Sequence, residues 1–412
     1  MNLDVQSLRT FSRLARSGAE QAAGSLATMT GFDARVAVTK VEMATRSDVE
    51  REFRERDLVT VHVDFSGAID GRTVLAFDRE RAASLVDALV PGESADPGSD
   101  LATSGLKELG NIMLGGFIDG WADFLGEGIE FTTPTYVELD AGRSLEDVTA
   151  DSEFANGEFG ADIDAGAEFG SGLDTEHVLA FRNHLETPDE EAGFYIYMLP
   201  TTDSVGTIVD AAGDGEETIP VESFTSFSQM ITEGAGQASE DLTAMTGIDT
   251  TVDVSRLSFV PVEGVPMELT DDARRGVVLE FTGTPSGYIA ILFDPESAES
   301  VADALMPGMD ADPEMQKSAI QEIGNIVTSG FLDGWADSLG TTIDISPPRY
   351  VDDIASAIVD PLVAELARTQ DYAFLIDSAI VTPDGAITCD IYALPDEQEL
   401  RTAFDQLTPG PN

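Results

Sequence analysis

The chain has 412 residues, which is more than one ordinary hydrophobic core accommodates, so we expect two domains or more. It carries 77 acidic and 22 basic residues, and its formal net charge of −55 excludes nucleic acid and anionic membranes as partners. No apolar run approaches the length of a membrane span, and the N-terminal residues lack the apolar stretch of a signal peptide. We therefore expect a cytoplasmic protein.

The acidic residues also bear on the solvent in which the chain folds. Only three of the basic residues are lysines, and this acid-rich, lysine-poor composition resembles that of proteins from extreme halophiles. At ~1 M salt the screening length falls to about 3 Å, which suppresses the self-repulsion of so negative a chain. We expect the protein to require concentrated salt to keep its structure.

The same series of elements is predicted twice along the chain. The first half reads as helix 5–28, strands 35–43, 58–66 and 73–77, a short helix capped by Asp78, a long helix within 104–126, a strand around Tyr136, and strands 178–183 and 194–199. The second half reads as helix 222–244, strands 251–260, 276–282 and 288–293, a short helix capped by Asp294, a long helix within 318–340, a strand around Tyr350, and strands 373–380 and 387–394.

Strands outnumber helices in this pattern and connect mostly as hairpins or through short helices. We therefore predict an α+β fold in which each half forms a largely antiparallel sheet layered with two long helices. A fainter repeat inside each half, of helix followed by strand, indicates that its two long helices are related by a pseudo-two-fold axis.

The repeat also sets the domain boundaries. Segments 104–126 and 318–340 agree at 14 of 23 positions, and shorter matches extend the similarity over both halves. We assign unit 1 to 1–200, an interdomain linker to 201–218 and unit 2 to 219–407. Unit 1 contains extra glycine- and acid-rich residues at about 140–174, which we interpret as a solvated loop or disordered insert.

A polar stripe runs along the long helix in each repeated segment. It consists of Ser104, Glu108 and Asn111 in the first copy and of Ser318, Glu322 and Asn325 in the second. Positions spaced in this way lie on one side of a helix. The apolar seam lies elsewhere, at Leu106, Leu109, Met113 and Phe117 and at Ile320, Ile323, Val327 and Phe331. Each helix is therefore predicted to present a carboxylate and a carboxamide together.

A proline completes the spacing Ser-x3-Glu-x2-Asn-x22-Pro in both copies, at Pro134 and Pro348. This spacing resembles the signature of the CheC/CheX/FliY family of chemotaxis phosphatases, which act on phosphorylated CheY. The resemblance covers both halves nearly end to end, so the chain looks like two fused CheC-type domains. It implies an enzyme that hydrolyses the aspartyl phosphate of CheY-type response regulators.

The resemblance also assigns roles to the motif residues. Asn111 and Asn325 would orient the attacking water, since a carboxamide oxygen accepts a hydrogen bond and its NH2 group can donate toward the phosphoryl group. Glu108 and Glu322 would pair with a lysine of the receiver and so align each helix on its partner. The two serines and two prolines would be architectural. The receiver would hold Mg²⁺ itself, so we expect no cofactor or metal on this chain.

The first long helix of each half departs from the signature. The positions that correspond to Glu, Asn and Pro are occupied by Arg13, Arg16 and Thr39 in the first half and by Gln229, Thr232 and Ser255 in the second. We interpret both of these helices as structural remnants. Two of the four long helices would then be active.

A second reading of the same resemblance is a binding module without catalysis. Such a module would be an adaptor that docks a CheD-type deamidase, or a switch component that holds phosphorylated CheY as FliM does. The intact Glu and Asn favour the enzyme, because a module that only binds has no need of the carboxamide.

Other residues near the motif carry less specific signals. Asp119 and Asp123 place carboxylates one turn apart, but no histidine lies near them and we interpret them as a salt-adapted surface. Trp121 and Trp335 are expected in the core. The glycines around them are expected to allow close helix packing or a bend, since no phosphate-binding glycine loop is present.

Overall fold

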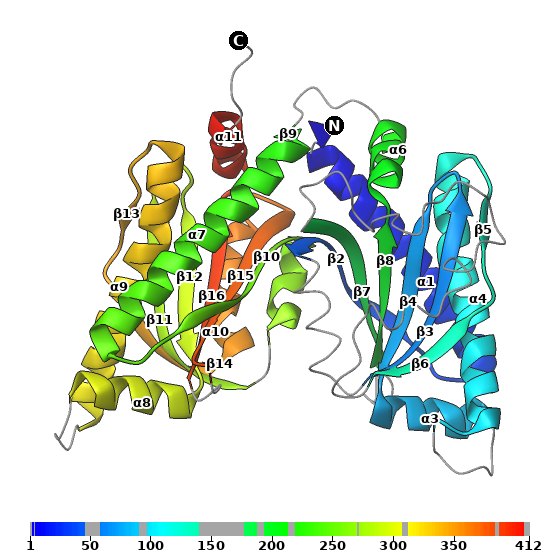
Figure 1. The fold of residues 1–412 in the computed structure, drawn as a ribbon, viewed down its shortest axis with the longest axis horizontal. Coiled ribbons are helices and arrows are strands. Elements are labelled where there is room, and N and C mark those ends of the chain that lie inside the picture. The colour runs from blue at the N-terminus through cyan, green and yellow to red at the C-terminus, as the bar shows by residue number, and fades with distance from the viewer. Residues whose placement is uncertain are drawn as a thin grey trace. The chain divides into compact units, whose positions relative to one another are not determined.

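The computed structural model describes residues 2–3, 5–45, 58–89, 97–139, 177–187, 193–212, 219–269, 272–306, 312–383 and 387–407. It divides into two compact units, Met1–Thr218 and Ile219–Asn412, which we describe separately (Figure 1). The insert that we predict at 140–174 lies outside the described residues.

The elements of unit 1 follow the predicted order. They are β1 (Asn2–Leu3), α1 (Val5–Thr30), β2 (Arg35–Thr45), β3 (Leu58–Gly67), β4 (Gly71–Asp78), α3 (Arg79–Leu89), α4 (Asp100–Leu125), β5 (Ile129–Phe131), β6 (Thr135–Leu139), β7 (His177–Glu186), β8 (Gly193–Pro200) and α6 (Thr202–Ala212).

Unit 2 repeats this series, and its 3-10 helix η2 and helix α10 have no counterpart among the residues of unit 1 that the structure describes. Its elements are β9 (Ile219–Pro220), α7 (Val221–Thr246), β10 (Thr251–Pro261), η2 (Val262–Glu268), β11 (Ala273–Thr282), β12 (Gly287–Phe293), α8 (Pro295–Leu305), α9 (Pro313–Leu339), β13 (Asp344–Ile345), β14 (Arg349–Ile354), α10 (Ala355–Leu366), β15 (Tyr372–Val381), β16 (Thr388–Pro395) and α11 (Glu397–Leu407).

Each unit contains an antiparallel sheet. In unit 1 the strands lie in the order β2-β7-β8-β4-β3, and both β5 and β6 pair with the outer edge of β3. Unit 2 has the same arrangement, β10-β15-β16-β12-β11, with β13 and β14 on the outer edge of β11. The α+β prediction is therefore confirmed, and the two halves share one topology.

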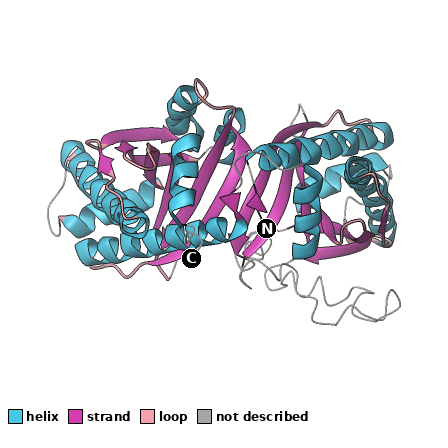
Figure 2. Ribbon diagram, turned by 90° about the horizontal axis from the view of Figure 1, so that it is seen from above, coloured by secondary structure: helices cyan, strands magenta, loops and turns pink. Residues whose placement is uncertain are grey.

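Two long helices pack side by side in each unit, α1 with α4 and α7 with α9 (Figures 1 and 2). They cross closely because glycines remove side chains from the crossing. A Cβ atom added at Gly18 would lie 2.9 Å from the Phe117 carbonyl oxygen, and one added at Gly234 would lie 2.6 Å from the Phe331 carbonyl oxygen. The glycines near the tryptophans lie at the same crossings: a Cβ atom added at Gly120 would lie 3.6 Å from the Gly18 Cα atom, and one added at Gly334 would lie 3.0 Å from the Gly234 Cα atom. Their predicted role in close helix packing is confirmed.

The apolar seams of α4 and α9 lie in the interior. All eight residues of the predicted seams are buried, and so are Trp121 and Trp335, which are fully enclosed. The ring of Trp121 packs against Phe181 of β7, and that of Trp335 packs against Phe281 of β11. Their predicted place in the core is confirmed, and burial of this seam leaves the opposite side of each helix to solvent.

The linker prediction at 201–218 is wrong for most of its length. Residues Thr202–Ala212 form the helix α6, which belongs to unit 1 and packs on α1. Its buried side chains, Val205, Ile208 and Val209, follow a helical spacing that is easily overlooked beside the acidic run that comes after them. The helix α11 occupies the equivalent position after β16 in unit 2.

Candidate functional site

Local capping interactions fix the ends of the two motif helices. At the start of α4 the Ser99 hydroxyl accepts a hydrogen bond from the Ala102 amide at 3.3 Å, and at the start of α9 the Asp312 carboxylate accepts one from the Met315 amide at 2.9 Å. Both helices end at a glycine with positive φ, which other residues rarely adopt: Gly126 at 70° and Gly340 at 61°. The ends of the motif helices are therefore defined by sequence.

Each motif helix packs closely on its sheet at the glycine that immediately precedes the motif asparagine. A Cβ atom added at Gly110 would overlap the side chain of Val61 on β3, and one added at Gly324 would overlap Val277 on β11. These glycines let the backbone approach the strand closely. They consequently set how far Asn111 and Asn325 stand from the sheet.

We expect Gly110→Ala and Gly324→Ala to destabilise their units, because the added methyl group must displace a buried, branched side chain. The expected loss is about 1–3 kcal/mol in the free energy of unfolding. Denaturant unfolding in concentrated salt measures it. Gly24→Ala in α1 is the matched control, since nothing lies within 4 Å of a Cβ atom there. Equal stability of the Gly110→Ala and Gly24→Ala variants would contradict the close contact of Gly110 with the strand.

The carboxylates and carboxamides of the motif stand on the solvent side of α4 and α9. Glu108 and Glu322 are exposed, and Asn111 and Asn325 are half-exposed. Within the described part of the chain, no hydrogen bond or ion pair engages these four side chains. At a spacing of three residues on a helix, the Cβ atoms of each Glu–Asn pair are ~5–6 Å apart. Each pair is therefore free to contact a partner.

The serines of the motif are bonded within their own helices. The Ser104 hydroxyl donates to the Asp100 carbonyl oxygen at 2.9 Å, and the Ser318 hydroxyl donates to that of Glu314 at 2.9 Å. This bond to the preceding turn is common for serine on an exposed helix face. Both hydroxyls are thus held one turn before the Glu side chains.

The prolines of the motif occupy the loops that follow each helix. Pro134 lies between β5 and β6, and Pro348 lies between β13 and β14. In unit 2 the loop is tied to the motif helix, because the Gln321 side-chain amide donates to the Pro348 carbonyl oxygen at 2.9 Å. Lys107 takes the place of Gln321 in unit 1. The glutamine-to-proline hydrogen bond between helix and loop in unit 2 therefore cannot form in the same way in unit 1.

The divergent positions of the first helix in unit 1 make contacts of their own. Arg13 donates to the Thr10 hydroxyl at 3.2 Å, and Arg16 pairs with Glu20 at 3.3 Å on the surface of α1. Thr39 is buried in the sheet and donates to the Asn183 side-chain oxygen at 2.8 Å. In unit 2, Gln229 and Thr232 lie exposed on α7. The structure thus brings no second Glu–Asn pair to these helices.

The carboxylates that follow the motif also point to solvent. Asp119 and Asp123 on α4 are exposed, as are Asp333 and Asp337 on α9. Among the residues that the structure describes, no group of three His, Cys, Asp or Glu side chains is placed to hold a metal ion. Nor does any helix in the described ranges have the length and apolar character that crossing a bilayer requires.

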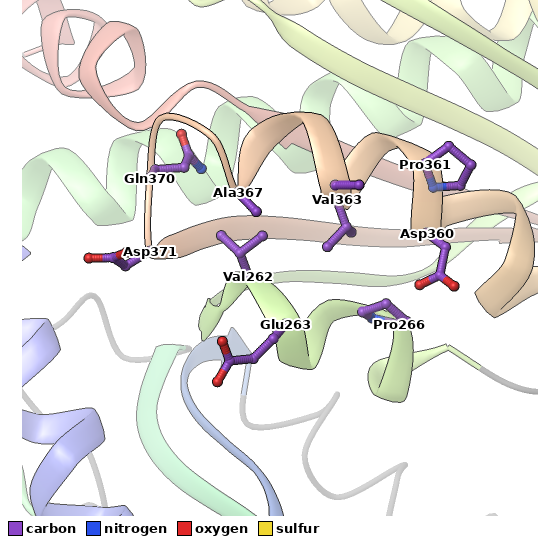
Figure 3. A pocket seen from close by; sticks show the side chains of 10 residues that line it. Val262, Glu263, Pro266, Asp360, Pro361, Val363, Ala367, Gln370 and Asp371 are labelled. Atoms are coloured by element: carbon purple, nitrogen blue, oxygen red, sulfur yellow. The ribbon is translucent and has the colours of Figure 1, made fainter.

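A cavity of about 620 Å³ lies apart from the motif in unit 2, between η2 and α10 (Figure 3). Its walls combine apolar side chains such as Val262 and Val363 with the carboxylates of Glu263, Asp360 and Asp371. Its lining has no histidine, cysteine, serine or threonine and so offers no hydroxyl or thiol nucleophile paired with a histidine base. We therefore place the candidate site on α4 and α9.

The motif regions match a known family. The profile of the CheC-like family matches residues 101–138 and 315–351, which run from α4 to β6 and from α9 to β14. The CheC1 protein of Halobacterium salinarum, named provisionally as a CheY-P phosphatase, is 35% identical over 186 residues, which cover 43% of this chain and 92% of that protein. The chain belongs to the CheC family. Its two profile matches make it a CheC-family protein with two motif regions.

Other similarities to this CheC-family chain cover less of it or are weaker. The protein of Thermotoga maritima named CheY-P phosphatase CheX is 35% identical over 89 residues, 22% of this chain and 54% of that protein. Among solved structures, Thermotoga maritima FliY aligns with 17% identity and a TM-score of 0.38, covering 52% of this chain and 98% of FliY. The FliM middle domain of H. pylori aligns with 11% identity and a TM-score of 0.34, covering 45% and 98%.

Proposed function

We propose that this CheC-family protein hydrolyses the aspartyl phosphate of a CheY-type receiver, with one Glu–Asn pair in each unit. The names of the relatives CheC1 and CheX support this activity. The observation that carries it is the position of the two pairs, which face solvent without a partner in the described part of the chain. A CheY-type substrate would place the activity in the cytoplasm.

The chemistry requires little from the enzyme. An aspartyl phosphate is an acyl phosphate that hydrolyses in water, so a catalyst need only hold a water in line with phosphorus without adding negative charge there. A carboxamide meets both needs, because it is neutral and its oxygen accepts a hydrogen bond from the water. Asn111 and Asn325 take this role, while acidic side chains of the receiver hold Mg²⁺. The carboxamide acts by positioning and takes up no proton at neutral pH.

The assay that tests this proposal follows loss of phosphoryl groups from the CheY-type receiver of the same organism, in molar salt. We expect the full chain to shorten the phosphoryl lifetime in proportion to its concentration until the receiver is saturated. An unchanged lifetime at a concentration where the two proteins bind each other would refute hydrolysis.

The carboxylates of the motif are proposed to align the helix on its partner. We expect Glu108→Ala/Glu322→Ala to weaken receiver affinity by up to about fivefold, since an exposed ion pair with the receiver's lysine, worth up to about 1 kcal/mol, is lost. The rate at saturating receiver should change less than the affinity, because the carboxamides remain. Titration calorimetry and the phosphoryl assay give the two quantities separately.

The matched control is Asp119→Ala/Asp333→Ala, which removes the same charge from an exposed position of the same helices. If both double variants lost affinity equally, the effect would be one of net charge. Alignment by Glu108 and Glu322 would then be wrong.

A further inference from the structure

Exposed apolar side chains gather around the Glu–Asn pairs. Seven large hydrophobic residues are exposed in the described part of the chain, and four of them lie on α4, β5 or α9. These four are Leu101, Ile112, Phe131 and Met315, with exposures of 49%, 37%, 37% and 36%. Exposed apolar residues that cluster in this way mark interaction sites more often than single ones do.

In unit 1 the apolar residues and the motif carboxylate share one surface. Leu101, Glu108 and Ile112 are spaced by seven and four residues, so they lie on the same side of α4. The ring of Phe131 lies next to this side, because a Cβ atom added at Gly115 would lie 3.2 Å from its Cζ atom. The absence of a side chain at Gly115 leaves room for that ring beside the turn that carries Ile112.

Unit 2 repeats this surface with different side chains. Met315, Ile326 and Ile345 occupy the positions of Leu101, Ile112 and Phe131; Met315 is exposed, and the two isoleucines are half-buried. The strand pairing is also the same, since Phe131 pairs with Phe65 on β3 as Ile345 pairs with Phe281 on β11. We call these two sets of three residues the apolar flanks of the sites.

The helix segments that carry most of the flank residues contain few charges compared with the rest of the chain, although the exposed Asp119 and Asp333 follow them directly. Residues 101–118 contain one acidic residue, Glu108, and one basic residue, Lys107. Residues 315–332 likewise contain Glu322 and Lys317. In a chain with 77 acidic residues and three lysines, two of those lysines lie on these segments. Each segment is neutral, so it repels an acidic partner less than the acidic residues around it do.

We propose that the apolar flanks are the docking surface for the receiver and supply most of its affinity. This inference rests on the proposed function and predicts that the receiver presents apolar side chains around its phosphorylated carboxylate. Concentrated salt favours apolar contacts, because at ~1 M salt the screening length of about 3 Å weakens any ion pair made by the exposed glutamates. Burial of apolar surface is not screened, and excluded salts such as sulfate strengthen it.

The experiment measures affinity for the same receiver loaded with beryllium fluoride, a stable mimic of its phosphoryl group, by titration calorimetry in molar salt. The variants are Leu101→Ser/Met315→Ser and Ile112→Ser/Ile326→Ser in the full chain. The control is Met267→Ser in η2, which removes a more exposed methionine (55%) away from both sites. Thermal unfolding of each variant shows whether its fold is intact.

We expect each double variant to lose about tenfold in affinity, with an unchanged rate at saturating receiver, and Met267→Ser to bind as wild type. Wild-type affinity should rise when sulfate is added. Unchanged affinity of both double variants, or affinity that falls with sulfate, would overturn the docking role while leaving hydrolysis intact. A wild-type chain that binds the loaded receiver through the flanks but does not shorten the phosphoryl lifetime would instead refute the proposed function alone.

Discussion

Replacing Asn111 and Asn325 together with alanine is expected to abolish the acceleration of receiver dephosphorylation. The carboxamide is the only group of the motif suited to holding a neutral water in line with phosphorus, and displacement of such a group by about 1 Å can cost 100-fold in rate. We expect a loss of about 100-fold or more at saturating receiver. Affinity for the beryllium fluoride-loaded receiver should change little, since Glu108 and Glu322 remain.

Two further variants make this test specific. Asn111→Asp/Asn325→Asp keeps the side-chain size but adds a negative charge toward the phosphoryl group, so we expect no recovery of rate. The single variants Asn111→Ala and Asn325→Ala apportion the activity between the units. If the double alanine variant and wild type gave equal phosphoryl lifetimes, the chain would be a binding module, such as an adaptor or a switch component.

Transfer from molar salt to ~10 mM salt is expected to unfold the protein. The screening length rises from about 3 Å to about 30 Å over this range, so the carboxylates of a chain with net charge −55 repel one another over the whole width of a unit. Far-UV circular dichroism and the melting temperature, followed during dialysis, measure the loss.

Screening depends on ionic strength, so a second salt at equal ionic strength should preserve the structure. The unfolding should also reverse when salt is restored. An unchanged spectrum and melting temperature at ~10 mM salt would show that the fold tolerates its charge. The composition would then not reflect adaptation to salt.

Long periodic patterns made most of the fold predictable. Helix 5–28 is observed as Val5–Thr30 and strand 251–260 as Thr251–Pro261, because a regular apolar face constrains both type and length. The helix α10 was missed, and its sequence explains why. Its N-cap residue, Ile354, provides no side-chain hydrogen bond, and Pro361 lies inside the helix, so the usual signals for a helix start and interior are absent.

The candidate site was predictable only as far as one helix determines it. The exposure of Glu108 and Asn111 follows from helical spacing opposite a buried seam. The contacts of Gly110 with Val61 and of Gly115 with Phe131 depend on which strand lies beneath the helix, and a local pattern cannot provide that. Helical spacing alone does not predict the apolar flanks, although the scarcity of acidic residues at 101–118 is a sequence signal for them.

The glycines at the helix crossings limit how far the two copies of the first long helix can diverge. The two copies of the first long helix differ at the motif positions, Arg13 against Gln229, yet both retain a glycine where the partner helix passes, at Gly18 and Gly234. Any side chain at these glycines would push away the helix that bears the Asn. The first long helix of a unit can therefore vary in its outward residues, while its inner contour must keep fitting the helix that bears the Glu–Asn pair.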